Sequence, residues 1–279
     1  MRIKVKQALS AEQPLAGVTV SGWVRTRRDA KDFSFVELND GSSFKNLQVV
    51  VDAAVPGAER LKDAVSGSSV SVEGQLVPSP AKGQKWELKA TAFRLLGRAD
   101  ETFPLQKKGH TVEFLRSIPH LRARTNRLGS MMRVRSRMAM AVHEFFQRRG
   151  FAYVHTPIVT ASDCEGAGEL FRVTTLDPSA PARTPDGQVD WAADFFAKQA
   201  YLTVSGQLEG ETLACALGDV YTFGPTFRAE NSHTSRHASE FWMIEPEMAF
   251  CDLAGDMDCA EELVKHLVRT ALETCADEL

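Results

Sequence analysis

The sequence lacks long apolar runs and paired-cysteine motifs, and each absence excludes a class of protein. No stretch approaches the length of a membrane-spanning helix, and the start, MRIKVKQALSAEQP, lacks the apolar core of a signal peptide. The five cysteines are odd in number and form no CxxC pair, which argues against a disulfide framework or a zinc site. We therefore expect a cytoplasmic protein with reduced cysteines, and we assign no metal-ligating residue.

Charge is nearly balanced overall but uneven along the chain. Residues 1–128 carry 21 Lys and Arg against 13 Asp and Glu, a net of +8, whereas residues 129–279 carry 12 against 23, a net of −11. A basic N-terminal part favours a polyanionic partner such as a nucleic acid. Basic surfaces without such a partner are also common, so charge alone leaves this question open.

The N-terminal part has the pattern of a small barrel. Five short β-prone runs are separated by turns, with a helical stretch at residues 58–65 between the third and the fourth. The candidate strands are residues 18–26, 33–39, 46–51, 69–76 and 86–95. This order is typical of an OB-fold, whose strand face binds single-stranded nucleic acid. Residues 97–111 follow without periodicity and are interpreted as a linker.

Charged side chains concentrate between two β-prone runs at residues 220–227 and 241–250. Arg228 and Glu230 are two residues apart and are expected on one strand face. A guanidinium suits phosphate oxygens, and a carboxylate can accept from an exocyclic amine, so the pair fits ATP. Arg236 and His237 at the far end of the loop add donors for a polyphosphate. An antiparallel hairpin with a solvated charged tip remains an equal alternative on spacing alone.

Three further side chains of this segment suit a nucleotide and an amino acid. Phe241 can place its ring against a base. Glu245 and Glu247 are expected on one face of a strand, where the ammonium group of an amino acid would need a counter-charge.

The same stretch resembles a known family. FRAE, a loop, and then RH and EF before an apolar strand resemble motif 2 of class II aminoacyl-tRNA synthetases, and FGPTFRAENSHTSRHASEFWMIEPE is similar to the asparaginyl members. The resemblance implies an N-terminal all-β OB-fold barrel and an incomplete α+β catalytic domain with an antiparallel sheet and helices. The implied domains are an anticodon-binding barrel at residues 1–100, a linker at residues 101–115 and a catalytic domain at residues 116–279.

The resemblance also implies roles for single residues. Arg228 is the implied catalytic residue, and it shares the ATP site with Glu230, Arg236, His237 and Phe241. The implied amino-acid site consists of Glu165, Ser205, Gln207 and Glu245. In the barrel, GWVRTRRD followed by FSFVEL resembles the anticodon-binding domain of this subclass, and the implied contacts to the middle anticodon base are Arg28, Phe35 and Gln48. Phe33, in contrast, is expected to fill the barrel.

One departure from a related pattern bears on the substrate. Aspartyl enzymes of this subclass read SPQLxKQ, with a lysine opposite the substrate carboxylate, whereas this chain reads SGQLEGE with Gly210 and Glu211 there. An aspartate side chain would be buried without its cation, which is costly. The implied substrates are therefore L-asparagine, ATP and tRNA(Asn), with Mg²⁺ bound by ligands that we expect outside this chain.

The region after the linker resembles motif 1 but no motif 3 follows. A helix is expected from Asn126, as its N-cap, to Arg149, with Gly150 as its stop, and this element implies a homodimer. No Gly-rich GxGxxR-type sequence follows Phe250; residues 251–279 have helical spacing and acidic character. Two alternatives therefore stay open: a tRNA-binding protein without aminoacylation activity, and an aspartyl enzyme of relaxed tRNA specificity.

Overall fold

The computed structural model describes the chain except for residues 107–108, 163, 165–169, 232–233 and 235–236. Two compact units are formed, one by residues 1–136 with 275–279 and the other by residues 137–274. The chain passes from the first unit to the second inside helix α4, Asn126–Arg148. In the described part of the chain, no helix is both long and apolar enough to cross a membrane.

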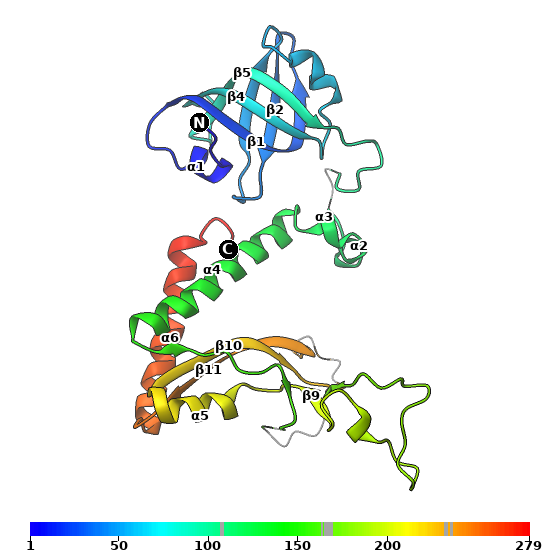
Figure 1. Cartoon of the computed structure of the whole chain (residues 1–279). Helices are drawn as coiled ribbons and strands as arrows, with labels where there is room; N and C mark the ends of the chain where they lie inside the picture. Colours follow the sequence, from blue (N-terminus) through cyan, green and yellow to red (C-terminus); the bar gives the residue numbers. More distant parts are fainter. Residues whose placement is uncertain (107–108, 163, 165–169, 232–233, 235–236) are drawn as a thin grey trace. The chain divides into compact units, whose positions relative to one another are not determined.

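The first unit contains a closed five-stranded barrel in the order β1-β2-β3-β5-β4, which confirms the predicted OB-fold (Figure 1). Its strands are β1 Leu15–Asp29, β2 Phe33–Asn39, β3 Leu47–Asp52, β4 Ser69–Pro78 and β5 Trp86–Gly97, with a 3-10 helix η1 at Ala58–Asp63 between β3 and β4. A short helix, α1 at Val5–Leu9, precedes the barrel and buries Val5 and Ala8. This helix was not predicted from the sequence.

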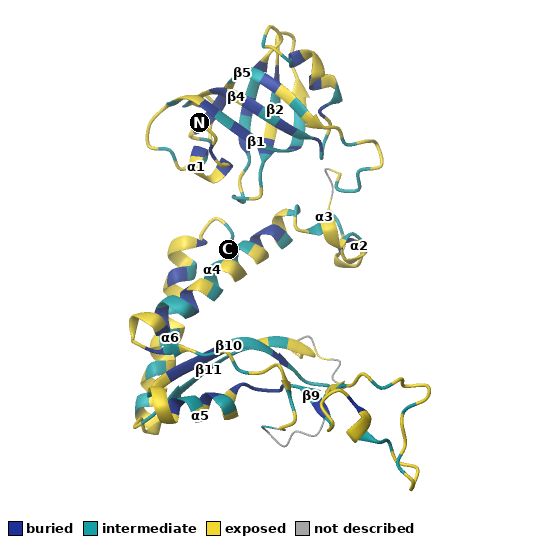
Figure 2. Cartoon of the chain, in the orientation of Figure 1, coloured by how far each residue is buried: buried dark blue, intermediate teal, exposed yellow. Residues whose placement is uncertain are grey.

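Alternation along each strand separates the barrel interior from its outer face. On β2 and β3, Val36, Leu38 and Val49 are fully buried, and the residues between them are at least partly accessible (Figure 2). The expectation for Phe33 was wrong. Its ring is 37% exposed on the outer face and lies edge-on to Phe35, with centroids 5.0 Å apart. Phe33 and Phe35 share that face because they are two residues apart on one strand.

Beyond the barrel, the chain forms two short helices, α2 at Val112–Ser117 and α3 at Pro119–Arg122, before α4 begins. Thr111 caps α2 by accepting a hydrogen bond from the backbone N–H of Phe114 at 3.2 Å. Asn126, expected as the N-cap of the long helix, is the first residue of α4. Its Oδ1 accepts a hydrogen bond from Arg25.

The second unit is built on an antiparallel hairpin. β10 (Asp219–Phe227) pairs with β11 (Glu240–Met248), and β6 (Ala152–Tyr153) adds a parallel strand on the other side of β10. A second small sheet has the order β7-β9-β8, with strands Val159–Thr160, Ala200–Leu202 and Arg172–Val173 respectively. A 3-10 helix, η2 at Trp191–Ala193, lies between β8 and β9 in the sequence.

The two faces of the hairpin carry different residues. On one face, Tyr221 packs with Phe146 of α4, and helix α6 (Leu253–Thr274) adds Leu263 and Leu267 to the same apolar cluster. On the other face lies α5, Gln207–Leu217, a helix that the sequence analysis did not predict. The α5 face of the sheet carries Thr222, Glu245 and Glu247, whose side chains alternate with the apolar ones.

Candidate functional site

The loop end of the hairpin holds the predicted catalytic arginine. β10 ends at Phe227, and the backbone N–H of Arg228 donates to the carbonyl of Ser239 at 3.1 Å, which extends the pairing by one step. The Arg228 guanidinium lies 5.5 Å from the centroid of the Phe241 ring, within cation–π range. The structure therefore brings together the cation and the aromatic ring that the sequence assigned to ATP.

The remaining ATP residues lie in the loop beyond the strand. Glu230 is exposed and follows the end of β10, so it does not share a strand face with Arg228. His237 is also exposed, and its Nδ1 is hydrogen-bonded to Thr234 Oγ1. Arg236 lies outside the described residues. The structure thus places Arg228 and Phe241 in contact and leaves Glu230 and His237 on the solvent side of the loop.

Glu245 stands at the centre of a hydrogen-bond network on the α5 face. Its Oε1 accepts from the hydroxyl of Ser205, and its Oε2 accepts from the backbone N–H of Gly206 at 3.2 Å and from Thr222 Oγ1 at 2.8 Å. Ser205 is only 2% exposed, and its Oγ also accepts from the N–H of Gln207 at 3.0 Å. Ser205 and Glu245 are therefore brought together, and they hold the turn that leads into α5.

Thr222 was not singled out in the sequence. Thr222 is the cross-strand partner of Glu245 in the hairpin, and predicting this pairing would have identified it. Gly206 is constrained by the same turn, because a Cβ atom there would lie 2.7 Å from Thr156 Oγ1. A side chain at position 206 would therefore displace the residues that surround the Glu245 carboxylate.

Helix α5 packs against a second glutamate of the sheet, Glu247. Gln207 Nε2 donates to Glu211 Oε1 at 2.9 Å, and both side chains are exposed. Gly210 is buried, and a Cβ atom there would lie 3.2 Å from Cγ of Glu247. Burial raises the pKa of Glu247, and the negative charges of Glu211 and Glu245 raise it further. This wall of the candidate amino-acid site is acidic and closely packed.

Glu165, the remaining predicted amino-acid contact, lies outside the described residues. Among the described residues, no group of three or more His, Cys, Asp or Glu side chains is placed to hold a metal ion.

The outer face of the barrel brings the three predicted anticodon residues onto neighbouring strands. Arg28 on β1 pairs with Phe35 on β2, and its guanidinium lies 4.9 Å from the Phe35 ring centroid. Gln48 on β3 lies two residues from Val50, the cross-strand partner of Phe35. A cation, an aromatic face and an amide thus occupy one continuous surface of three adjacent strands, as single-stranded recognition requires.

A buried carboxylate that the sequence analysis missed lies beside Gln48. Glu87 of β5 is the cross-strand partner of Gln48 and is only 5% exposed. Its Oε2 accepts from Gln48 Nε2 at 3.3 Å and from Ser79 Oγ at 3.0 Å. The position of Glu87 next to Trp86 in an apolar run gave no signal of this pairing, which depends on the register between β3 and β5.

Comparison with known proteins finds a family for each part of the chain. A family model described as tRNA synthetases class II (D, K and N) matches residues 111–279, and one described as an OB-fold nucleic acid binding domain matches residues 18–96. The chain belongs to the class II tRNA synthetase family. The resemblance found in motif 2 is thereby confirmed.

Two relatives of known name are asparagine–tRNA ligases. The asparagine–tRNA ligase of Microcystis aeruginosa is 57% identical over 100% of this chain and 60% of its own length, and that of Synechocystis sp. is 60% identical over 94% of this chain and 57% of its own length. The crystal structure of the Pyrococcus horikoshii asparaginyl-tRNA synthetase, complexed with asparaginyl-adenylate, superposes with a TM-score of 0.78 at 30% identity. It covers 95% of this chain and 57% of that chain. The chain thus spans no more than about three-fifths of the length of these relatives.

Proposed function

We propose that the chain forms the anticodon-reading barrel and part of the catalytic site of an asparagine–tRNA ligase. Such an enzyme activates L-asparagine with ATP to asparaginyl-adenylate and transfers the asparaginyl group to tRNA(Asn). The identity of 57–60% with asparagine–tRNA ligases, over nearly the whole chain, supports this proposal. Phe241, which contacts Arg228, and Glu245 lie on one face of the hairpin, as adjoining sites for ATP and an amino acid require, whereas Phe35 lies on the barrel.

The first step is an in-line displacement at phosphorus. A carboxylate oxygen of asparagine attacks the α-phosphorus of ATP, the bond from that phosphorus to the bridging β-phosphate oxygen breaks, and pyrophosphate leaves. Negative charge accumulates on the phosphoryl oxygens, and the planar guanidinium of Arg228 is the group suited to stabilise it. The attacking carboxylate is already ionised, so the step needs no general base. A ribose hydroxyl at the tRNA 3′ end then attacks the carbonyl carbon and releases AMP.

The proposed contacts to ATP follow the hairpin. Phe241 contacts one side of the Arg228 guanidinium, which fixes its orientation toward a phosphate. Glu230 is proposed to accept from the adenine amine, and His237 with Arg236 to contact the outer phosphates. The exposure of Glu230 and His237 leaves both side chains accessible to a nucleotide.

The choice of asparagine over aspartate rests on the packing at Gly210. In aspartyl enzymes the corresponding position is a lysine, whereas here Glu247 lies 3.2 Å from where a Cβ atom would stand. A substrate carboxylate would meet the acidic side chains of Glu211 and Glu247, while a side-chain amide can donate hydrogen bonds to them. Glu245, Ser205, Gln207 and Glu165 are proposed to hold the ammonium and backbone groups of the substrate.

Three further elements of the proposal rest on the family. The outer face of the barrel is proposed to contact the middle anticodon base through Arg28, Phe35 and Gln48. A homodimer is proposed through α4, on which Met131, Met132 and Met140 are exposed. Mg²⁺ is proposed to accompany ATP without a ligand assigned in this chain, and the location is proposed to be cytoplasmic.

The role of Arg228 is tested by substitution in the complete protein. Arg228→Ala is expected to abolish asparagine-dependent exchange of pyrophosphate into ATP, because no other group assigned here stabilises the charge at the α-phosphorus. Arg228→Lys keeps the positive charge but lacks the planar guanidinium with its paired donors. It is expected to retain only a small part of the exchange rate. Binding of tRNA should change little in either variant.

Near-normal exchange by Arg228→Ala would refute the assigned role. Binding of tRNA without any exchange by the unmodified complete protein would instead favour a tRNA-binding protein without aminoacylation activity.

A further inference from the structure

A β-bulge in β1 turns one arginine of the RTRR run away from the anticodon face. The pairing with β2 shifts between Val24 and Thr26, which leaves Arg25 as the extra residue. Bulges re-aim the side chain at the inserted position. Nη1 of Arg25 donates to the backbone carbonyl of Arg124, and Nη2 donates to Asn126 Oδ1 at 2.5 Å. Arg25 therefore contacts the segment that leads into α4, whereas Arg28 stays over Phe35.

The partner segment is held by a second arginine. The Arg124 guanidinium lies 4.3 Å from the Trp23 ring centroid and 6.0 Å from that of Phe103. Burial lowers the pKa of Arg124, and the charge of Arg25 lowers it further. Two like charges are brought close together here, and stacking on aromatic rings together with forked hydrogen bonds offsets their repulsion.

The first part of the linker also packs against the barrel. The Phe103 ring covers Gly67, where the backbone has φ of +91° and a Cβ atom would lie 2.6 Å from the ring. The backbone N–H of Ala99 donates to Ser68 Oγ at 3.0 Å, so the chain is hydrogen-bonded to the barrel directly after β5. Only glycine at position 67 allows both the left-handed backbone and the close approach of the ring.

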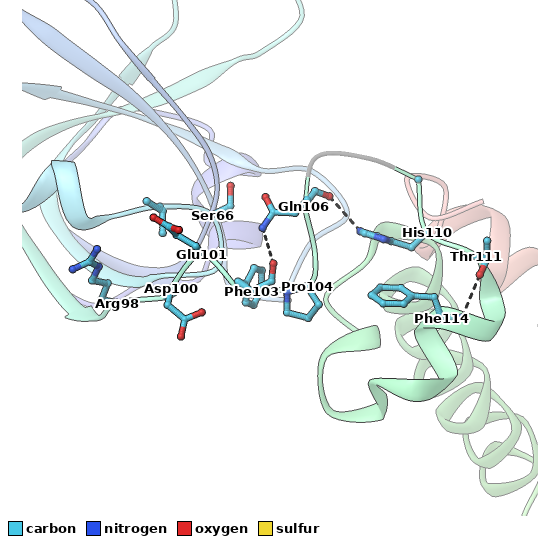
Figure 3. A pocket seen from close by; sticks show the side chains of 13 residues that line it. Ser66, Arg98, Asp100, Glu101, Phe103, Pro104, Gln106, His110, Thr111 and Phe114 are labelled. Carbon is cyan, nitrogen blue, oxygen red and sulfur yellow. Dashed lines mark hydrogen bonds between the residues drawn. The ribbon is translucent and has the colours of Figure 1, made fainter.

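These contacts border a hollow of about 710 Å³ between the barrel and the linker (Figure 3). On its linker side, Gln106 Nε2 donates to the Phe103 carbonyl at 2.6 Å, and the rings of His110 and Phe114 stack with centroids 5.3 Å apart. The described residues between β5 and α4 are thus held by specific contacts, although their sequence shows no periodic pattern.

We propose that Arg25, with Arg124 as its stacked partner, is a positioning residue that locks the barrel to the first turn of α4. The inference rests on the proposed function. A tRNA that binds the barrel by its anticodon must also deliver its 3′ end to a second site. Its effective concentration there depends on how rigidly the barrel is held. Arg25 therefore acts on the transfer step through the orientation of the barrel and contacts no substrate itself.

The rival role for Arg25 is a direct electrostatic contact to tRNA, and Arg25→Lys separates the two. Lysine keeps the positive charge, but its single ammonium replaces a planar fork that reaches two acceptors at once. In the complete protein we expect kcat/KM for full-length tRNA to fall roughly tenfold or more. Affinity for an isolated anticodon stem-loop and the rate of asparagine-dependent pyrophosphate exchange should stay within about twofold.

Two controls define the result. Arg94→Lys makes the same chemical change at an exposed position of β5 and should leave all three measurements unchanged. In a double-mutant cycle, Asn126→Ala should add little to Arg25→Lys, because the two substitutions remove the same hydrogen bond.

A second readout does not depend on activity. Amide hydrogen exchange of residues 119–128 in this chain should accelerate in Arg25→Lys, whereas exchange in the barrel strands should not. Loss of stem-loop affinity in Arg25→Lys, or unchanged amide exchange together with unchanged aminoacylation, would overturn the proposal. Absence of asparagine-dependent exchange in the unmodified complete protein would instead refute the proposed function, and the amide-exchange result would stand by itself.

Discussion

At the scale of single residues, the α5 face of the hairpin shows how one carboxylate can organise a site. Glu245 accepts from Ser205, Gly206 and Thr222, so its orientation is fixed before any substrate binds. The sequence identified Glu245 and Ser205 through the family motif. It could not show that they bond to each other, because 40 residues separate them and the contact depends on how β9 leads into α5.

Glu247 yields a prediction about pH. Burial and the neighbouring carboxylates raise its folded pKa above the ordinary value of 4.5. Between these two values the native state binds more protons than the unfolded chain, so this group makes the free energy of unfolding fall as pH rises through that window. Glu247→Gln removes this pH-dependent fall in the free energy of unfolding. The variant should therefore gain stability relative to the unmodified chain as pH rises from 4 to 7.

Urea unfolding of this chain at a series of pH values measures the effect. Glu273→Gln, at an exposed position of α6, controls for the loss of one negative charge. Parallel stability curves for Glu247→Gln and the unmodified chain would contradict the account.

At the scale of elements, the barrel was predictable from the sequence, and the region around the β10–β11 hairpin was only partly predictable. β2 was predicted at its observed bounds because alternation and turn residues define it locally. Helix α5 was missed because a glycine at position 206 is typical of a turn, and the packing of α5 against β10 and β11 decides its structure. The bulge at Arg25 was also missed, since register against β2 leaves no mark in the sequence of β1.

The junction between α4 and β10 yields a prediction about stability. Tyr221 is fully buried, and its hydroxyl is hydrogen-bonded to His143 Nδ1 at 2.8 Å. Tyr221→Phe leaves that imidazole without its partner and should lower the free energy of unfolding by about 1–3 kcal/mol. Tyr153→Phe is the matched control, because its hydroxyl donates to the Phe223 carbonyl at a more exposed position. Equal losses in the two variants, measured by urea unfolding, would argue against a special role for the buried pair.

At the scale of the whole molecule, we propose that nucleic-acid recognition and adenylate formation belong to different units. Phe35→Ala removes a stacking surface and should weaken tRNA binding by about 1–3 kcal/mol, while asparagine-dependent pyrophosphate exchange stays unchanged. Leu96→Ala, which removes an exposed apolar side chain elsewhere on the barrel, should affect neither. Filter binding and exchange assays on the complete protein measure both effects. Unchanged tRNA affinity in Phe35→Ala would remove this ring from the anticodon face.

The central claim is that the chain belongs to an enzyme that activates asparagine and rejects aspartate. The most direct test measures exchange of labelled pyrophosphate into ATP by the complete protein, with asparagine or aspartate as the only amino acid. We predict exchange with asparagine and none above background with aspartate, because in the proposed site Gly210 and the acidic side chains of Glu211 and Glu247 lie where an aspartate would need a cation. Comparable exchange with aspartate, or none with asparagine, would contradict the account.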